Sequence, residues 1–150
     1  KPALDFLGIN YYGRTLMSFA FKAPFVMPNE GPGVKSDLGW EIYPEGLEVA
    51  IKDSFARFGL PIMITENGIA DKNDVLRTRF IKEHIEALKR AQDANIPVLG
   101  YMHWSLTDNF EWALGQKPRF GLVEIDYLNK AKRKLRPSAK IYSELIKNLN

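Results

Sequence analysis

One short segment constrains the fold of this chain more than any other: an apolar run that ends in a carboxylate, IMITENG at residues 62–68. Side chains alternate between the two faces of a strand, so we expect Ile62, Ile64 and Glu66 to share one face. Burying a carboxylate costs free energy unless it has a partner. The segment therefore predicts one of two structures. Either a buried strand of a parallel α/β protein presents Glu66 at its carboxyl end, or an Asn-Gly turn follows a solvated Glu66.

Alternating helices and strands surround this segment. Other near-continuous apolar runs have the character of buried strands, and the stretches between them place apolar side chains at helical spacing. Pro44 marks the start of the first helix, and Gly59 lies beyond its end. In chain order, the predicted elements are a strand at 4–12, a long irregular loop at 13–43, a helix at 44–58, the strand that ends at Glu66, a helix at 75–93, a strand at 98–104, a hairpin with arms at 122–127 and 132–135, and a helix that begins at Pro137.

Each predicted helix has an apolar face for the core. His84 lies beside the apolar face of the second helix, and we expect it to be a packed histidine rather than a metal ligand. The side chains expected to face inward are Leu47, Ala50, Ile51, Phe55 and Phe58 in the first helix, Phe80, Ile81, Ile85 and Leu88 in the second, and Ile141, Tyr142, Leu145, Ile146 and Leu149 in the last.

Most residues that could carry chemistry lie where the predicted strands end. In a (β/α)8 barrel the active site lies at the carboxyl ends of the strands, and the alternation of strands and helices fits that fold. Such a barrel needs eight strands and about 250 residues, whereas this chain has 150 residues. We therefore predict an α/β fold, with residues 1–150 forming an incomplete part of a single TIM-barrel domain. The residues at the strand ends are Asn10, Tyr12, Glu66, Trp104, Asp108, Glu111 and Trp112.

Composition excludes several classes of site. The sequence contains no cysteine and two histidines, which excludes disulfide frameworks and Cys/His zinc sites, and we expect no metal and no cofactor. No apolar run is long enough to span a membrane, so we expect no membrane partner. The lack of cysteine is compatible with a reducing environment, and we predict a cytoplasmic protein. No glycine-rich phosphate loop follows a predicted strand, which argues against nucleotide binding.

The densest run of positive charge, residues 130–136, admits two interpretations. Lysine and arginine side chains neutralise phosphates, so the run could bind nucleic acid. Alternatively, it is the solvated arm of a hairpin. No aromatic side chains that would stack on bases are interleaved with these charges, and the net charge is only +3. We therefore favour the hairpin and expect no nucleic-acid partner.

Carboxylates beside tryptophans are typical of carbohydrate sites. The apolar face of a pyranose packs on an indole ring, while its hydroxyls pair with carboxylates and amides. Two carboxyl groups that flank a glycosidic bond are the usual machinery of its hydrolysis. On residue types alone, Glu66 and Glu111 would be the two catalytic groups.

Three segments in this order resemble family 1 of the glycoside hydrolases, the retaining β-glucosidases and β-galactosidases. They are DFLGINYY at 5–12, TENG at 65–68 and WSLTDNFEW at 104–112, and the similarity continues to RPSA at 136–139. TENG resembles the family's nucleophile motif at the end of the seventh barrel strand, and WSLTDNFEW resembles its sugar-binding segment after the eighth. The resemblance covers the chain essentially from end to end. It implies the C-terminal part of the barrel, about strands six to eight with their helices.

The resemblance implies a role for each candidate residue and changes the pairing given above. Glu66 resembles the nucleophile that forms a covalent glycosyl-enzyme intermediate, and Tyr12 resembles the tyrosine that donates a hydrogen bond to it. Glu111 becomes a substrate ligand rather than a catalytic group. The related 6-phospho-glycosidases carry a serine there, so the carboxylate implies a neutral sugar. The implied substrate-binding residues are Asn10 near the sugar 2-hydroxyl, Trp104 under the glycone, and Glu111 and Trp112 at its outer hydroxyls.

One catalytic group of the family is missing from the sequence. The family's acid/base glutamate lies in an Asn-Glu-Pro motif after the fourth strand. No Asn-Glu-Pro occurs here, and the nearest string is PNEG at 28–31. The resemblance therefore implies an N-terminal half-barrel partner, from the same longer polypeptide or from a second chain, and a β-linked oligosaccharide or glycoside as substrate. The alternative is a catalytically inert half-barrel that binds sugar or serves as a structural subunit.

Further segments place the chain within the family. GWEIYPEG at 39–46, YMHW at 101–104 and RFGLV at 119–123 look most like archaeal and thermophilic members.

Overall fold

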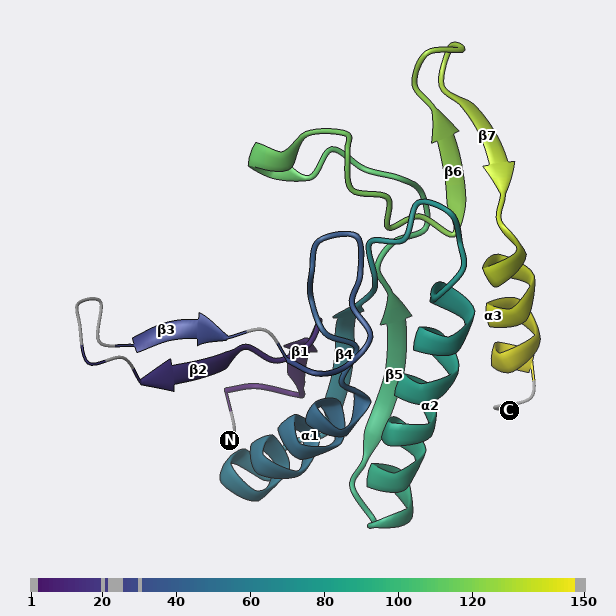
Figure 1. Ribbon diagram of the computed structural model, residues 1–150. Helices are drawn as coiled ribbons and strands as arrows, with labels where there is room; N and C mark the ends of the chain where they lie inside the picture. The colour runs from purple at the N-terminus through teal and green to yellow at the C-terminus, as the bar shows by residue number, and fades with distance from the viewer. Residues whose placement is uncertain (1–2, 20, 22–25, 30, 148–150) are drawn as a thin grey trace.

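A sheet of three parallel strands forms the centre of the molecule. The computed structural model describes residues 3–19, 21, 26–29 and 31–147. The strands are β1 (Leu7–Asn10), β4 (Ile62–Asn67) and β5 (Val98–His103), in the order β1-β4-β5 (Figure 1). The predicted parallel sheet is confirmed, with the Glu66 strand in the middle. Within the described residues, β1 and β5 are both edge strands.

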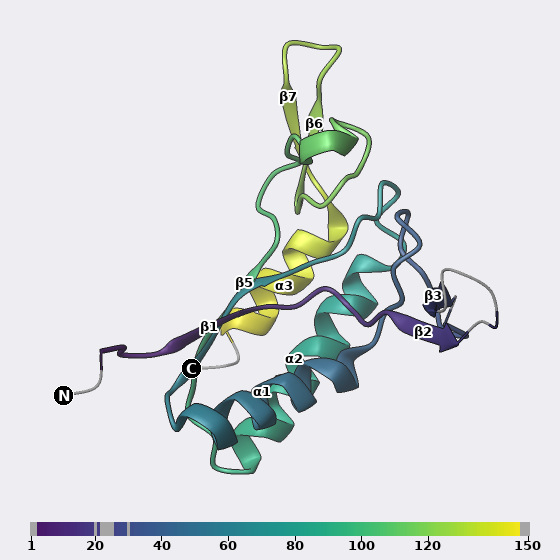
Figure 2. The same cartoon turned by 90° about the vertical axis from the view of Figure 1, so that its left-hand side faces the viewer.

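Three helices accompany the sheet: α1 (Pro44–Phe58), α2 (Arg77–Asp93) and α3 (Pro137–Lys147). α1 and α2 lie side by side on one face of the sheet, and α3 packs beside α2 (Figures 1 and 2). Gly59 ends α1 in the left-handed conformation and donates its N–H to the Phe55 carbonyl. Both predicted boundaries of α1 are confirmed. α2 begins two residues later than predicted, where Asp71 accepts the N–H groups of Leu76 and Arg77.

The main core lies between the sheet and its two covering helices. Its buried members are Leu47, Ile51, Ile62, Ile64, Leu88, Ala91 and Ile96. A smaller cluster joins Ile81, Ile85 and Leu122 to one side of α3. Burying apolar surface in this way contributes about 25 cal/mol per Å² to folding. The helical periodicity therefore identified the side of α1 and α2 that packs on the sheet.

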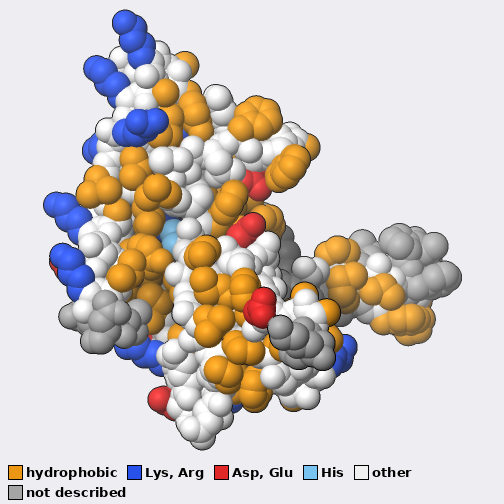
Figure 3. Space-filling model, turned by 180° about the vertical axis from the view of Figure 1, so that it is seen from behind, with side chains coloured by type: hydrophobic (Ala, Val, Ile, Leu, Met, Phe, Trp, Pro, Cys, Tyr) orange, Lys and Arg blue, Asp and Glu red, His pale blue; other side chains and the backbone are white. Residues whose placement is uncertain are grey.

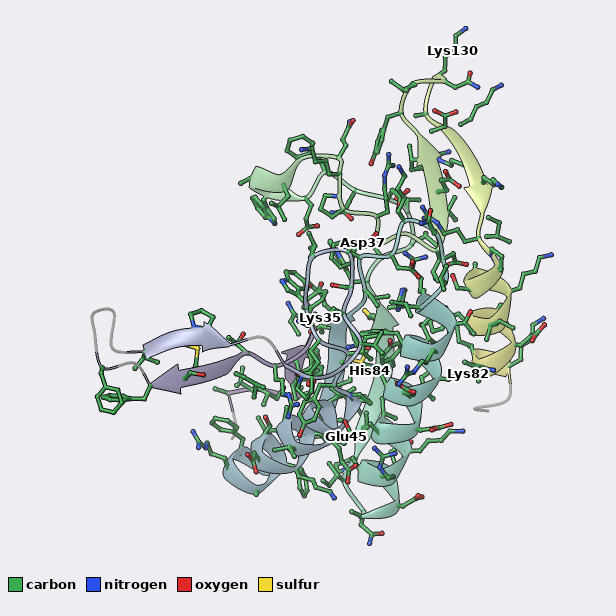
Figure 4. The ribbon with its side chains drawn as sticks, viewed as in Figure 1. Lys35, Asp37, Glu45, Lys82, His84 and Lys130 are labelled. Atoms are coloured by element: carbon green, nitrogen blue, oxygen red, sulfur yellow. The ribbon has the colours of Figure 1, made fainter. Side chains whose placement is uncertain are left out.

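A few predicted core residues behave differently. Phe58 is 56% exposed and Ile146 is 44% exposed, because each lies in the last turn of its helix, beyond the packed part. Leu149 lies outside the described residues. His84 is fully buried between α2 and the sheet (Figure 4), and its ring stacks on Phe80 with the centroids 3.9 Å apart. The prediction of a packed histidine is confirmed.

The predicted facing of the central strand is wrong at its end. Ile62 and Ile64 are fully buried against the helices, and Asn67 rather than Glu66 joins them on the buried side. The pairing of β4 with β5 shifts register between Ile64 and Asn67. Such an irregularity breaks the strict alternation of strand faces. Glu66 is consequently only partly buried and does not share a face with the two isoleucines.

Two hairpins extend from the central layers. Residues 13–43 are not an irregular loop throughout, because β2 (Leu16–Phe19) and β3 (Val26–Asn29) pair antiparallel. Pro28 lies within β3, and proline is tolerated in a strand that has a free edge. The second hairpin, β6 (Val123–Asp126) with β7 (Lys132–Leu135), is confirmed as predicted. Its basic side chains are exposed, and Lys130 lies at its tip (Figure 4).

The sheet face opposite α1 and α2 carries no helix in the described part of the chain. Side chains that point to this face include Met63 and Met102, and Met102 is 51% exposed. Figure 3 shows hydrophobic side chains gathered over it. Leu4 and Phe6, predicted in a buried strand, are exposed and precede β1. Parallel sheets normally have both faces covered, so within the described residues this face lacks the covering layer that α1 and α2 form on the other.

None of the described helices combines the length and the apolar character that crossing a membrane requires.

Candidate active site

The side chains of Tyr12 and Glu66 meet at the carboxyl ends of two neighbouring strands. Glu66 lies near the end of β4, and Tyr12 lies two residues beyond β1. The Tyr12 hydroxyl donates a hydrogen bond of 2.7 Å to Oε2 of Glu66. The Tyr11 N–H donates to the Glu66 carbonyl at 2.9 Å, so backbone pairing reaches this level. Glu66 is therefore a partnered carboxylate at a strand end, not a solvated residue before a turn.

Tyr12 is held in its protonated form. Burial raises the pKa of its phenol above the ordinary value, and the hydrogen bond to Glu66 raises that pKa further. The negative charges of Glu66 and Glu111 act in the same direction. Tyr12 therefore remains a hydrogen-bond donor to Glu66, and Glu111 belongs to the same electrostatic environment.

Aromatic rings surround Tyr12. Its ring lies edge-on to Trp40 and Phe120, with centroids 5.8 and 6.1 Å away. Trp40 sits next to Glu41, which is nearly buried and accepts two hydrogen bonds from Arg14, of 2.7 and 3.1 Å. Sequence reasoning missed Trp40 as a site residue, because its loop has no periodicity that would place it near a strand end.

Asn10 and Trp104 flank the pair from the two edge strands. Oδ1 of Asn10 accepts a 2.7 Å hydrogen bond from the Thr65 hydroxyl on the open sheet face, so Asn10 does not contact Glu66 through this amide oxygen. Trp104 follows β5, and its backbone N–H donates to the Asn67 carbonyl at 2.9 Å. A Cβ at Gly68 would overlap the carbonyl oxygen of Trp104. The glycine of the TENG segment is therefore required for the close approach of these two chain segments.

Glu111 and Trp112 lie on the loop after β5. Nδ2 of Asn109 donates a 2.6 Å hydrogen bond to Oε2 of Glu111, which orients the carboxylate. Trp112 begins the short 3-10 helix η1 (Trp112–Leu114) and is 86% exposed. The charge of Glu111 thus acts on Tyr12, while Trp112 is largely in solvent. Among the described residues, no group of three His, Asp or Glu side chains could hold a metal ion.

Asp108 organises the loop that carries Glu111. Its buried carboxylate accepts hydrogen bonds from Arg136 at 2.9 and 3.1 Å, and from the N–H groups of Gly121 and Ile125. Burial alone would raise the pKa of Asp108, but these hydrogen bonds outweigh it and lower the pKa. Asp108, one of the polar residues predicted at strand ends, is therefore occupied with protein partners.

The geometry is that of a carboxylate site with aromatic walls, and comparison with known proteins assigns it to a family. The profile of Glycosyl hydrolase family 1 matches residues 1–150, the full length of the chain. The chain belongs to glycosyl hydrolase family 1.

Named members of family 1 resemble this chain closely. A β-galactosidase of Sulfolobus acidocaldarius is 40% identical over 99% of this chain and 32% of its own length. β-Glucosidase A of Thermotoga maritima is 38% identical over 99% of this chain and 35% of its own. The structure of a Thermotoga maritima β-glucosidase in complex with azafagomine superimposes with a TM-score of 0.90 at 37% identity, covering 97% of this chain and 35% of that one. The leaning toward archaeal and thermophilic members is confirmed.

The chain spans about a third of the length of the curated family 1 relatives that it matches. Its fold is accordingly a partial TIM barrel of the β-glucosidase type. The open sheet face and the two strand edges follow from this partial coverage, because a barrel has no free edges.

Proposed function

We propose that this chain is the C-terminal part of a retaining β-glycosidase, contributing about strands six to eight of one TIM-barrel domain and acting on β-glucosides or β-galactosides. The observation that carries the proposal is the hydrogen bond from Tyr12 to Glu66 at adjacent strand ends. The names of the relatives support hydrolysis of β-glycosides. A carboxylate that accepts a hydrogen bond from Tyr12, whose ring lies against Trp40 and Phe120, suits attack on a sugar.

In the proposed mechanism, Glu66 attacks the anomeric carbon and forms a covalent glycosyl-enzyme. The bond to the leaving oxygen breaks as an acid outside this chain donates a proton to that oxygen. Water then attacks the anomeric carbon and displaces Glu66, after giving its proton to the same group, now a base. Two inversions retain the configuration, and the two carboxyl groups should lie about 5–5.5 Å apart.

The other candidate residues bind the sugar. Trp104 lies under the apolar face of the glycone, and Asn10 approaches its 2-hydroxyl. Glu111 and Trp112 contact its outer hydroxyls. The exposure of Trp112 in this chain fits a residue that closes over bound sugar rather than one packed in the protein. Tyr12 orients the Glu66 carboxylate for attack.

The first prediction concerns completeness. This chain alone should show no hydrolysis of an aryl β-glucoside, because no Asn-Glu-Pro acid/base motif occurs in it. Co-expression with the N-terminal portion of Thermotoga maritima β-glucosidase A, ending before its equivalent of residue 1, should restore hydrolysis. Light scattering and an aryl-glucoside assay, on each part and on the mixture, measure both effects. A monodisperse, cooperatively folded and fully active monomer of this chain would contradict the missing-acid proposal.

The second prediction concerns Glu111, which residue types alone paired with Glu66 as a catalytic group. If Glu111 is a substrate ligand, Glu111→Gln should raise KM and shift the preference between gluco- and galacto-substrates. The reason is that the outer hydroxyls of the sugar lose a charged hydrogen-bond acceptor. A general acid would behave differently. Its loss would move the basic limb of the pH–rate profile and spare substrates with good leaving groups, and that pattern would refute the ligand role.

A further inference from the structure

The residue after Glu66 links the end of β4 to the segment that follows β1 and to β5. Asn67 is fully buried at the end of β4. Its Nδ2 donates a 2.7 Å hydrogen bond to the carbonyl of Tyr11, the residue before Tyr12. Its Oδ1 accepts a 2.7 Å hydrogen bond from the Tyr101 hydroxyl on β5. Its own carbonyl accepts the Trp104 N–H at 2.9 Å.

The chemistry of these partners fixes the orientation of the Asn67 amide. The Tyr11 carbonyl can only accept a hydrogen bond, so the NH2 group must face it. The Tyr101 hydroxyl then acts as the donor to Oδ1. A buried donor without an acceptor costs about 1–3 kcal/mol, so this arrangement is held strongly. Asparagine supplies a donor on one side and an acceptor on the other, whereas an ionised aspartate of the same length supplies acceptors alone.

The side chain acts where the backbone ladder is irregular. The pairing of β1 with β4 shifts between Ile9 and Asn10, and that of β4 with β5 shifts between Ile64 and Asn67. One backbone hydrogen bond still joins the chain on each side here, from the Tyr11 N–H to the Glu66 carbonyl and from the backbone N–H of Trp104 to the Asn67 carbonyl, but the ladder around them is irregular. The Asn67 amide spans both irregular junctions at once.

We propose that Asn67 is a positioning residue that holds Tyr12 and Trp104 in place relative to Glu66. It acts through the Tyr11 carbonyl on one side and through its own backbone and Tyr101 on the other, without touching substrate. The inference rests on the proposed function, in which Glu66 is the nucleophile.

The test uses Asn67→Asp in the active family 1 enzyme that contains this chain. A carboxylate there would point an oxygen at the Tyr11 carbonyl, whereas the protonated acid would donate to it as the amide does. The titratable groups around this position are Glu66 before it on β4, Tyr11 and Tyr101, which contact its amide, His103, its register partner on β5, and His84 on α2, whose ring lies 6.0 Å from that of Tyr11. Burial favours the protonated form of a new carboxyl at position 67 as the pH falls.

At neutral pH, kcat of Asn67→Asp should fall on the order of 10²-fold with KM changed far less, because a misplaced nucleophile loses rate rather than binding. The ratio of variant to wild-type kcat should rise as the pH is lowered. Trapping of the glycosyl-enzyme with a 2-fluoro-glycoside should slow by a similar factor and should recover as the pH is lowered. Purely structural damage to a folded enzyme would not depend on pH in this way. The matched control is Asn95→Asp, an exposed asparagine after α2, which should leave all of these unchanged.

Circular dichroism at each pH confirms that the variants are folded. If Asn67→Asp does not fold, Tyr101→Phe carries the test and should lower kcat about tenfold; it removes the donor to Oδ1 together with a long 3.4 Å contact to Nδ1 of His103. A folded variant whose kcat stays within twofold of wild type, or whose ratio does not change with pH, would overturn the role of Asn67. An active Glu66→Gln would instead overturn the proposed function itself.

Discussion

Replacing Glu66 by glutamine should reduce turnover of an aryl β-glucoside on the order of 10⁴-fold or more, while substrate still binds. The amide keeps the shape of the carboxylate and still accepts the hydrogen bond from Tyr12, but it cannot form the glycosyl-enzyme. Steady-state kinetics of the assembled enzyme with an activated substrate measure the loss. The expected effect is therefore on kcat, with KM little raised.

Two companion variants make the Glu66 experiment specific. Glu66→Gly leaves space for a small anion, so azide should restore part of the cleavage and yield an inverted, α-configured glycosyl azide. Glu144→Gln, on the exposed side of α3, is the matched control and should retain wild-type turnover. Near-wild-type activity of Glu66→Gln would remove this residue from the mechanism.

Replacing Asp108 by leucine should lower the free energy of unfolding by about 3–5 kcal/mol, because it leaves the guanidinium of Arg136 buried without its counterion. That is a large part of the total stability of a typical domain, about 5–15 kcal/mol. Chemical denaturation, read by circular dichroism, measures the change. Asp126→Asn at the exposed end of β6 should cost far less.

A double variant separates the ion pair from the fold around it. The double variant Asp108→Leu with Arg136→Met should lose less stability than the sum of the two single losses, because neither of these two charges is then left unpaired. Additive single losses would show that Asp108 and Arg136 do not interact energetically.

Because the pKa of Asp108 is lowered in the folded protein, its contribution to stability depends on pH. That contribution is complete above the pKa of Asp108 in the unfolded chain. It is lost as the pH falls through the lower pKa of the folded state.

Periodicity predicted the elements well and their faces less well. The β1-β4-β5 sheet, α1 to α3 and the β6–β7 hairpin all follow from apolar spacing and from Pro and Gly at helix ends. Periodicity did not predict which face of the sheet Ile62 and Ile64 occupy, because a parallel sheet buries both of its faces and the sequence does not distinguish them. The register shift before Asn67 has no sequence signature, so Glu66 was wrongly assigned to the same face as Ile62 and Ile64.

The site shows a similar division. Glu66 and Tyr12 could be found because both lie at strand ends, and their hydrogen bond joins strands that the topology makes neighbours. Trp40 comes from a loop whose position depends on the Arg14–Glu41 pair, a contact between residues far apart in the chain. The occupation of Asp108 by Arg136 likewise depends on tertiary packing. Local patterns carry no information about such long-range partners.

The open sheet face also sets a volume requirement for whatever covers it. Met63 pairs in register with Gly8 on one side and Gly100 on the other, so one transverse row across the sheet reads small, large, small. A Cβ at Gly8 would lie 3.1 Å from the Thr65 methyl, and one at Gly100 would lie 3.2 Å from the Met63 sulfur. The side chains of Thr65 and Met63 therefore lie close to the space above these two glycines. TIM barrels fill their centre with stacked layers of side chains from alternate strands. In the proposed complete barrel, side chains from the remaining strands would pack over the two glycines against the side chains of Thr65 and Met63.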